Sequence, residues 1–380
     1  MKKLIIIMVL TGLFISCNKV SKENVLIEKS KAKKIRLNNI VLDTIILDKI
    51  QSSYFGFLTI NNDTLQFVDS RFCWVFLFDK NGKFIKRVLG QGKGPKEIST
   101  GVIDSYVTLE DGRHLFVGSS WDCHIFSKHW IRLQEYRINW QIKHTKEEML
   151  SNPKPDMPGL YTLMYDKLEI RIKDNYAYLP IESQHPKFNM ANSRNYYENA
   201  RILAKMDINT GAITELIGRR SEEYSKYSFI PQFSYFSFDI AGQDFFYVSF
   251  EPDSLIYKYD KNMELLSIFG FNGTEMDKNY IETNSIPAVQ KIYKKERNTK
   301  GYYTWIEYFD QHDLLFRAYQ KGAHTQNDGL QIYQHGILIA DVNVPKGMNI
   351  EGYIEPYYYS NAIIDEMNET MKVYRFKLDL

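Results

Sequence analysis

The sequence is poor in cysteine, with only Cys17, Cys73 and Cys123 among 380 residues. A small fold held together by disulfides is therefore excluded, because such scaffolds need a dense set of cysteines. Cys73 and Cys123 both lie in strand-like stretches. One bridge between them is an alternative, and two separately buried thiols are the interpretation that we favour.

An excess of charge is also missing, since 48 Lys and Arg stand against 46 Asp and Glu. Lys2 and Lys3 account for the whole difference, because without residues 1–16 the balance is 48 − 2 = 46 against 46. A neutral chain lacks the basic surface that nucleic acids or anionic membranes attract. We therefore expect no nucleic-acid partner and binding through local sites. Separately, we expect a monomer.

Recognisable catalytic motifs are absent as well. The eight histidines show no H-x-H, H-E-x-x-H or cysteine-paired spacing, and no G-x-S-x-G occurs. The glycine run at residues 90–95, GQGKGP, is followed by Pro and β-like sequence rather than by a helix that could hold a phosphate. The sequence thus predicts a backbone corner there, and no catalytic residue, bound metal or cofactor is predicted.

One apolar run, residues 4–14, follows Lys2 and Lys3 and is too short to span a membrane. Such a run is typical of an export signal. Ser16 followed by Cys17 resembles a bacterial lipobox, in which the cysteine is lipidated. We expect a signal peptide over 1–16 and a lipidated Cys17 with a flexible tether over 17–34, facing the periplasm because no acidic run follows. A plain signal peptide is the alternative.

The remaining chain is rich in Tyr (27) and Phe (23), alternates apolar with polar residues, and has little helical periodicity. Residues 145–150 are the best helix candidate. The pattern of 74–90, WVFLFDKNGKFIKRVLG, consists of a strand, an Asp, a short turn, a second strand and a Gly, and it returns in other segments. Further copies, some weaker, lie at 123–138, 202–218, 255–270, 330–344 and, as a first half only, 371–380.

The Asp position of this pattern recurs at 79, 127, 207, 260, 334 and 377. The spacings of 48, 80, 53, 74 and 43 fit a four-stranded propeller blade of about 40–45 residues, two of them with insertions. We predict an all-β, six-bladed β-propeller over 35–380 with four-stranded antiparallel blades. An N-terminal strand from residues 35–50 is expected to close the ring, because the last copy lacks its outer strand.

The first copy carries a family resemblance through Phe78, Asp79, Gly82, Lys83 and Phe84, followed by Gly90, Gly92, Gly94, Pro95 and Glu97. These residues resemble the hallmark of the six-bladed β-propeller lipoproteins of Bacteroides-type bacteria, a branch of the NHL-repeat and TolB-like propellers. The resemblance implies a cell-envelope protein and implies no particular reaction.

Propeller topology puts the fourth-to-first and second-to-third connections at one end of the ring, around the channel mouth. Aromatic and charged residues in these connections suit an oligosaccharide or a peptide. The predicted ligand-binding residues are Arg71, Lys93, Trp121, Asp122, Arg219, Arg220, Glu251 and Asp253.

Our first hypothesis is a lipid-anchored, non-catalytic module that binds a glycan, a peptide or an envelope protein at this mouth. The alternative is a metal-dependent hydrolase or lyase of the propeller lactonase type. In this alternative, Glu251, Asp253 and Asn272 would hold a calcium ion on the axis, and we leave this alternative open.

We predict that Cys17→Ser moves the protein from the membrane fraction to the soluble fraction without unfolding it. An acyl chain contributes about 0.8 kcal/mol per buried CH₂, and the sequence offers no other membrane-binding feature. Fractionation followed by immunoblotting and a thermal melt checks both parts. A mutant that stays on the membrane contradicts the lipid anchor.

Overall fold

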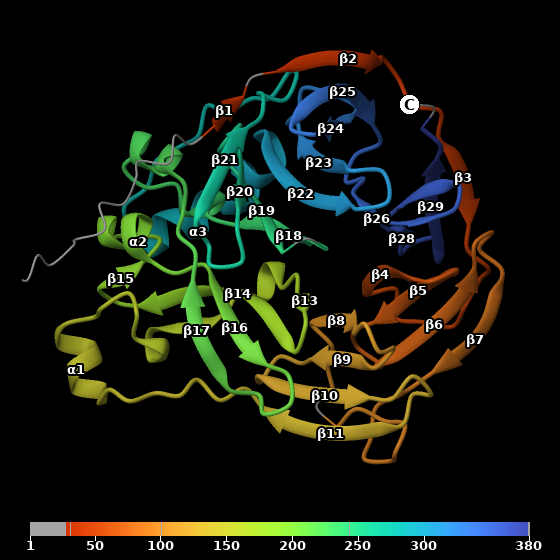
Figure 1. Cartoon of the computed structure of the whole chain (residues 1–380), viewed down its shortest axis with the longest axis horizontal. Coiled ribbons are helices and arrows are strands. Elements are labelled where there is room, and N and C mark those ends of the chain that lie inside the picture. The colour runs from red at the N-terminus through yellow and green to blue at the C-terminus, as the bar shows by residue number, and fades with distance from the viewer. Residues whose placement is uncertain (1–27, 31, 100, 243, 379–380) are drawn as a thin grey trace, which may run out of the picture.

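Six β-sheets surround a central axis in the computed structural model, which describes residues 28–30, 32–99, 101–242 and 244–378 (Figure 1). The predicted all-β six-bladed propeller is confirmed. The predicted signal peptide and Cys17 lie outside the described residues. Among those described, no helix is long and apolar enough to cross a membrane.

Blades one, two, four and five each contain four antiparallel strands that follow chain order from the axis outwards. Blades one and two consist of β4 (Gly56–Asn61), β5 (Thr64–Asp69), β6 (Trp74–Asp79) and β7 (Phe84–Val88), then β8 (Ser105–Thr108), β9 (His114–Val117), β10 (Asp122–Phe126) and β11 (Arg132–Arg137). Blades four and five consist of β18 (Phe236–Ala241), β19 (Phe245–Phe250), β20 (Ile256–Tyr259) and β21 (Leu265–Phe269), then β22 (Tyr302–Phe309), β23 (Leu314–Gln320), β24 (Asp328–Gln334) and β25 (Ile337–Val344).

Blades three and six are interrupted. In blade three, β12 (Tyr161–Leu163) and β13 (Arg171–Lys173) share the innermost position on β14 (Tyr176–His185), which also pairs with β15 (Phe188–Asn189). The outer strands of this blade are β16 (Leu203–Asp207) and β17 (Ile213–Ile217). Blade six contains β26 (Ile350–Ile354), β27 (Tyr357–Ser360), β28 (Ile363–Asp365) and β29 (Thr370–Phe376).

The N-terminal strands lie along the outside of three successive blades (Figure 1). β1 (Glu28–Ser30) pairs in parallel with β21, β2 (Lys33–Leu37) pairs in parallel with β25, and β3 (Asp43–Ile46) pairs antiparallel with β29. Closure of blade six by an N-terminal strand is thus confirmed. Blades four and five have five strands rather than the expected four, because β1 and β2 satisfy their outer edges. The described end of the predicted tether is therefore strand, not flexible chain.

The repeated Asp position caps the hairpin between the third and fourth strands. Asp79 Oδ1 accepts two backbone N–H groups at 2.8 and 3.0 Å, and Asp260 accepts two at 2.9 and 2.8 Å. In blade two the hydroxyl of Ser127 does the same at 3.3 and 3.2 Å. Gly82 takes the positive φ of 85° that this turn requires. The sequence repeat therefore reflects one kind of hairpin turn, capped by a side-chain oxygen, that recurs in several blades.

The glycine-rich run forms the predicted corner between blades one and two. Gly92 has a φ of 150°, whereas no left-handed φ is found at Gly94. The Glu97 carboxylate accepts the Gly94 N–H at 2.7 Å, and Arg132 Nη2 donates to the Lys93 carbonyl at 3.0 Å. The Gly94 N–H is thus already bound by a carboxylate of the same chain. This favours a structural corner and disfavours a site for an anionic ligand.

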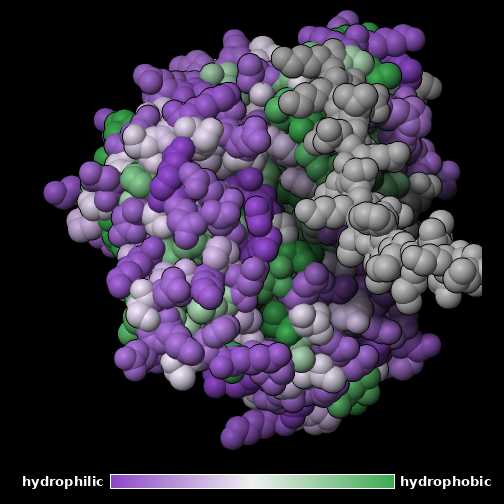
Figure 2. All heavy atoms as spheres, turned by 60° about the vertical axis from the view of Figure 1, so that its left-hand side comes forward, coloured by the Kyte–Doolittle hydropathy of each residue, from purple (hydrophilic) through white to green (hydrophobic). Residues whose placement is uncertain are grey.

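The core consists of apolar layers between neighbouring blades rather than one central cluster. Cys73 and Cys123 are buried in separate layers as free thiols, as favoured above. On the outside, hydrophobic residues form small scattered groups in a mainly hydrophilic surface (Figure 2).

Three α-helices lie in the connections of the part of the chain that the structure describes. The predicted helix is confirmed as α1 (Lys146–Ser151), and Thr145 and Glu148 form its capping box. The other two, α2 (Arg194–Asn199) and α3 (Ile286–Thr299), were not predicted. α3 begins after Ser285 with Pro287 in its first turn, a start signal that its weakly apolar sequence obscured.

We predict that a chain beginning at Ser52 melts several degrees below one beginning at Asn39. Both lack β1 and β2, whose described side chains are mostly exposed, but only the Ser52 chain lacks β3 and the buried Ile45 and Leu47. Burial of each such side chain is worth about 1.5–3 kcal/mol, and the loss also exposes an edge strand. Calorimetry of both chains checks this, and equal melting temperatures contradict it.

Candidate functional site

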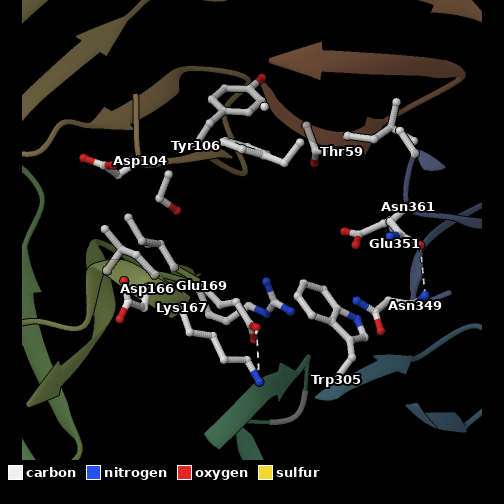
Figure 3. Close-up of a pocket in the computed structure, with 18 residues that line it drawn as sticks. Thr59, Asp104, Tyr106, Asp166, Lys167, Glu169, Trp305, Asn349, Glu351 and Asn361 are labelled. Carbon is white, nitrogen blue, oxygen red and sulfur yellow. Dashed lines mark hydrogen bonds and ion pairs between the residues drawn. The ribbon is translucent and has the colours of Figure 1, made fainter. Parts of the chain in front are cut away.

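A polar cavity of about 360 Å³ lies on the axis, where the innermost strands of blades one, two and six begin (Figure 3). The residues that line it belong to five blades. They are Gly56–Thr59 of β4, residues 104–106 at β8, residues 166–171 of blade three, Trp305 of β22, and residues of blade six. Because these starts follow the fourth-to-first connections, the cavity lies at the predicted end of the ring.

Blade three shapes this cavity through a break in its innermost strand. Between β12 and β13 the chain leaves the sheet as a short 3-10 helix, Tyr165–Lys167, and returns at Arg171. The Met164 N–H still donates to the Pro180 carbonyl at 3.0 Å, which fixes where the excursion starts. This excursion places Lys167, Glu169 and Arg171 on the cavity wall.

Arg171 is the centre of a buried ion network. Its Nε lies 2.8 Å from Asp239 Oδ1 on β18, and its Nη2 lies 2.6 Å from Glu307 Oε2 on β22. Burial raises the pKa of Asp239 and that of Glu307, and the Arg171 guanidinium opposes this rise. One cation thus links the inner strands of three blades.

Lys167 and Glu169 form a second, looser pair, with 3.7 Å between Nζ and Oε1. Lys167 Nζ donates to the Thr304 carbonyl at 2.6 Å, and Ser237 Oγ donates to Glu169 Oε2 at 2.7 Å. Lys167 is therefore tied to blade five and Glu169 to blade four.

Glu351 on β26 differs from the other acids of the channel. Its carboxylate makes no hydrogen bond or ion pair with the residues that the structure describes. Burial, with a smaller contribution from Glu169, raises the pKa of Glu351 to about 8, although Arg171 lowers it. Glu351 is thus an acid that titrates near neutral pH in an accessible cavity.

The lip of the cavity is connected to α3. The Tyr235 hydroxyl donates to Asp166 Oδ2 at 2.7 Å, and the Tyr293 hydroxyl of α3 lies 3.3 Å from that of Tyr235. Asp104, on the opposite wall, has a buried Oδ2 that no described residue hydrogen-bonds, and burial raises the pKa of this side chain.

None of the eight predicted ligand-binding residues lines this cavity. Arg71, Lys93 and Arg219 are exposed, and Arg71 lies 4.8 Å from the ring of Phe55. Asp122 pairs with Arg137 at 3.2 Å. Contact of these residues with a ligand stays a prediction.

The other four predicted residues contact neighbouring groups of the protein in this structure, and their contact with a ligand also stays a prediction. Trp121 donates its backbone N–H to the Tyr165 hydroxyl at 3.2 Å, beside the excursion. Glu251 is 1% exposed and pairs with an arginine of α3 at 2.6 Å, and Asp253 accepts the hydroxyl of a neighbouring tyrosine at 2.7 Å. Arg220 is 7% exposed, lies over the Tyr196 ring at 4.4 Å and donates to its hydroxyl at 2.8 Å.

A metal centre has no obvious place among the described residues, where no group of three His, Cys, Asp or Glu side chains could hold an ion. Glu251 and Asp253, two members of the alternative calcium site, are each engaged with other side chains.

Solved structures share this fold. A member of the DUF4221 family from Bacteroides vulgatus is 13% identical with a TM-score of 0.64, and the match covers 90% of this chain and 98% of that one. A putative exported protein from Bacteroides fragilis is 12% identical with a TM-score of 0.51, covering 92% and 98%. No family model and no curated protein matches the chain. At such identities the likeness extends to the fold alone.

We predict that Glu351→Gln stabilises the protein progressively as the pH rises from about 5 to about 8. The folded-state pKa of about 8 lies above the ordinary value of 4.5, so the native protein holds a proton that the unfolded chain releases. Its stability therefore falls with rising pH in this window, by at most about 1.4 kcal/mol per pH unit from this group. Urea unfolding of both proteins at several pH values checks this. A stability difference that stays constant contradicts the high pKa.

Proposed function

We propose that the protein is a lipid-anchored module of the cell envelope that binds, without catalysis, the end of a glycan or peptide at the channel mouth. The observation that carries this proposal is the cavity of about 360 Å³ on the axis. Ligand sites in proteins span about 300–1,000 Å³, so this one fits a single sugar or amino-acid residue.

The lining has the composition of a recognition site for a polar ligand. Trp305 offers an apolar surface, and its indole N–H is already held by the Ile350 carbonyl at 2.9 Å, which fixes the ring. Asn349 and Asn361 add polar side chains beside it (Figure 3). A fixed aromatic next to amides and charges provides both contact area and orientation.

The envelope location and the periplasm-facing anchor rest on the N-terminal sequence, with Cys17 as the lipidated residue. One structural neighbour is described as a putative exported protein, which agrees with this location. The binding site and the anchor use different parts of the chain, since the cavity is lined by residues from 56 onwards.

We predict that Ala362→Trp abolishes ligand binding by filling the cavity that Ala362 lines. Titration with panels of oligosaccharides and short peptides, followed at the indole N–H resonance of Trp305, gives the affinity. The control is Lys261→Trp, which adds the same side chain at an exposed hairpin turn. Ligands that bind both variants equally, or a panel that never perturbs Trp305, contradict a site in the channel.

A further inference from the structure

The cavity has more acidic than basic side chains. Its lining contains two cations, Lys167 and Arg171, against four carboxylates, those of Asp104, Asp166, Glu169 and Glu351. Both cations are already paired, Lys167 with Glu169 and Arg171 with two carboxylates behind the wall. Once Glu351 has lost its proton, the unbalanced charge of the cavity is therefore negative, which disfavours an anionic ligand.

Glu351 directs its carboxylate towards the open space of the cavity, and it has no hydrogen-bonding or ion-pairing partner among the described residues (Figure 3). A desolvated carboxylate without a partner is costly, and a cation brought in by a ligand would offset this cost. The titratable and charged groups around it on the channel walls are Asp104, Asp166, Lys167, Glu169, Arg171, Asp239 and Glu307.

Two amide oxygens lie on the same side of the cavity as Glu351 (Figure 3). Asn361 Oδ1 accepts the Asn349 N–H at 2.9 Å, and Asn349 Oδ1 accepts the Thr304 hydroxyl at 3.3 Å. An amide oxygen has two lone pairs, so each can accept one more hydrogen bond. With the carboxylate they make three acceptors, which is the number of donors on an ammonium group.

We propose that the ligand of the channel mouth carries a protonated primary amine, which pairs with Glu351 and donates to the side-chain amides of Asn349 and Asn361. This inference rests on the proposed function, because it names the ligand chemistry of the same cavity. An amino sugar or a lysine side chain would both supply this group.

Two matched pairs of probes distinguish these sources. The first pair is 6-amino-6-deoxyglucose and glucose, and the second is Nα-acetyl-lysine amide and Nα-acetyl-norleucine amide. The full chain is titrated with each probe between about pH 6 and pH 8, followed at the Trp305 indole resonance. In at least one pair we expect the amine to bind at least tenfold more tightly than its neutral partner. Its affinity should rise by up to about tenfold per pH unit, because Glu351 must lose a proton to form the ion pair.

Glu351→Gln should remove both the preference for the amine and the rise with pH, while Glu366→Gln, an exposed acid of the same blade, should keep both. Neutral probes that bind as tightly as the amines would overturn the amine and leave the proposed binding function standing. Probes of either kind that never perturb Trp305 would overturn both. An amine preference that persists unchanged in Glu351→Gln would show that Glu351 is not its partner.

Discussion

Closure of the ring is the constraint on which the rest of the structure depends. β29 would present an open edge if β3 did not pair with it, as Val373 does opposite Ile45. Propellers must satisfy such edges, because unpaired strand edges invite association with other chains. This chain does so with a segment that also covers the edges of blades four and five. The N-terminal strands therefore hold three blades in succession.

Closure leaves a second problem at the axis, where six innermost strands converge and their inward side chains cannot all pack. The chain fills this space with charged residues that neutralise one another across blades, with Arg171 between Asp239 and Glu307. Buried pairs of this kind are weak evidence for stability, but removal of one partner is costly. The network consequently fixes how blades three, four and five meet, and it leaves Glu351 unpaired.

The fold could be predicted from the sequence because each blade repeats the same local chemistry. A side-chain acceptor such as Asp79 or Ser127 caps the hairpin, and a residue of positive φ follows it, so the pattern can be read within about twenty residues. The parallel strands β1 and β2 lack such a signal, since their partners lie far along the chain. Residues up to 34 looked like a tether because they are rich in charged side chains, as are Glu28 and Lys29 of β1 and the two lysines that begin β2.

The site could not be predicted in the same way. Arg171, Glu307 and Glu351 are single polar residues in strand-like segments far apart in sequence, and no spacing indicates that they meet. Their presence in innermost strands was the one available signal, since a charged residue there must face the channel or a partner. Among the loop residues that we selected, Glu251 forms an ion pair with an arginine of α3 at 2.6 Å, and its contact with a ligand stays a prediction.

Closure of the ring also brings two walls of the cavity together. The cavity walls of blade one, at β4, and of blade six, at Glu351, are brought together only where the ring closes. β26 approaches β4 so closely that a Cβ on Gly352 would lie 2.8 Å from the Ile60 side chain. An opened ring would separate these walls and expose the acids that the network holds. The polar cavity on the axis is therefore lined in part by the two blades that meet where the ring closes.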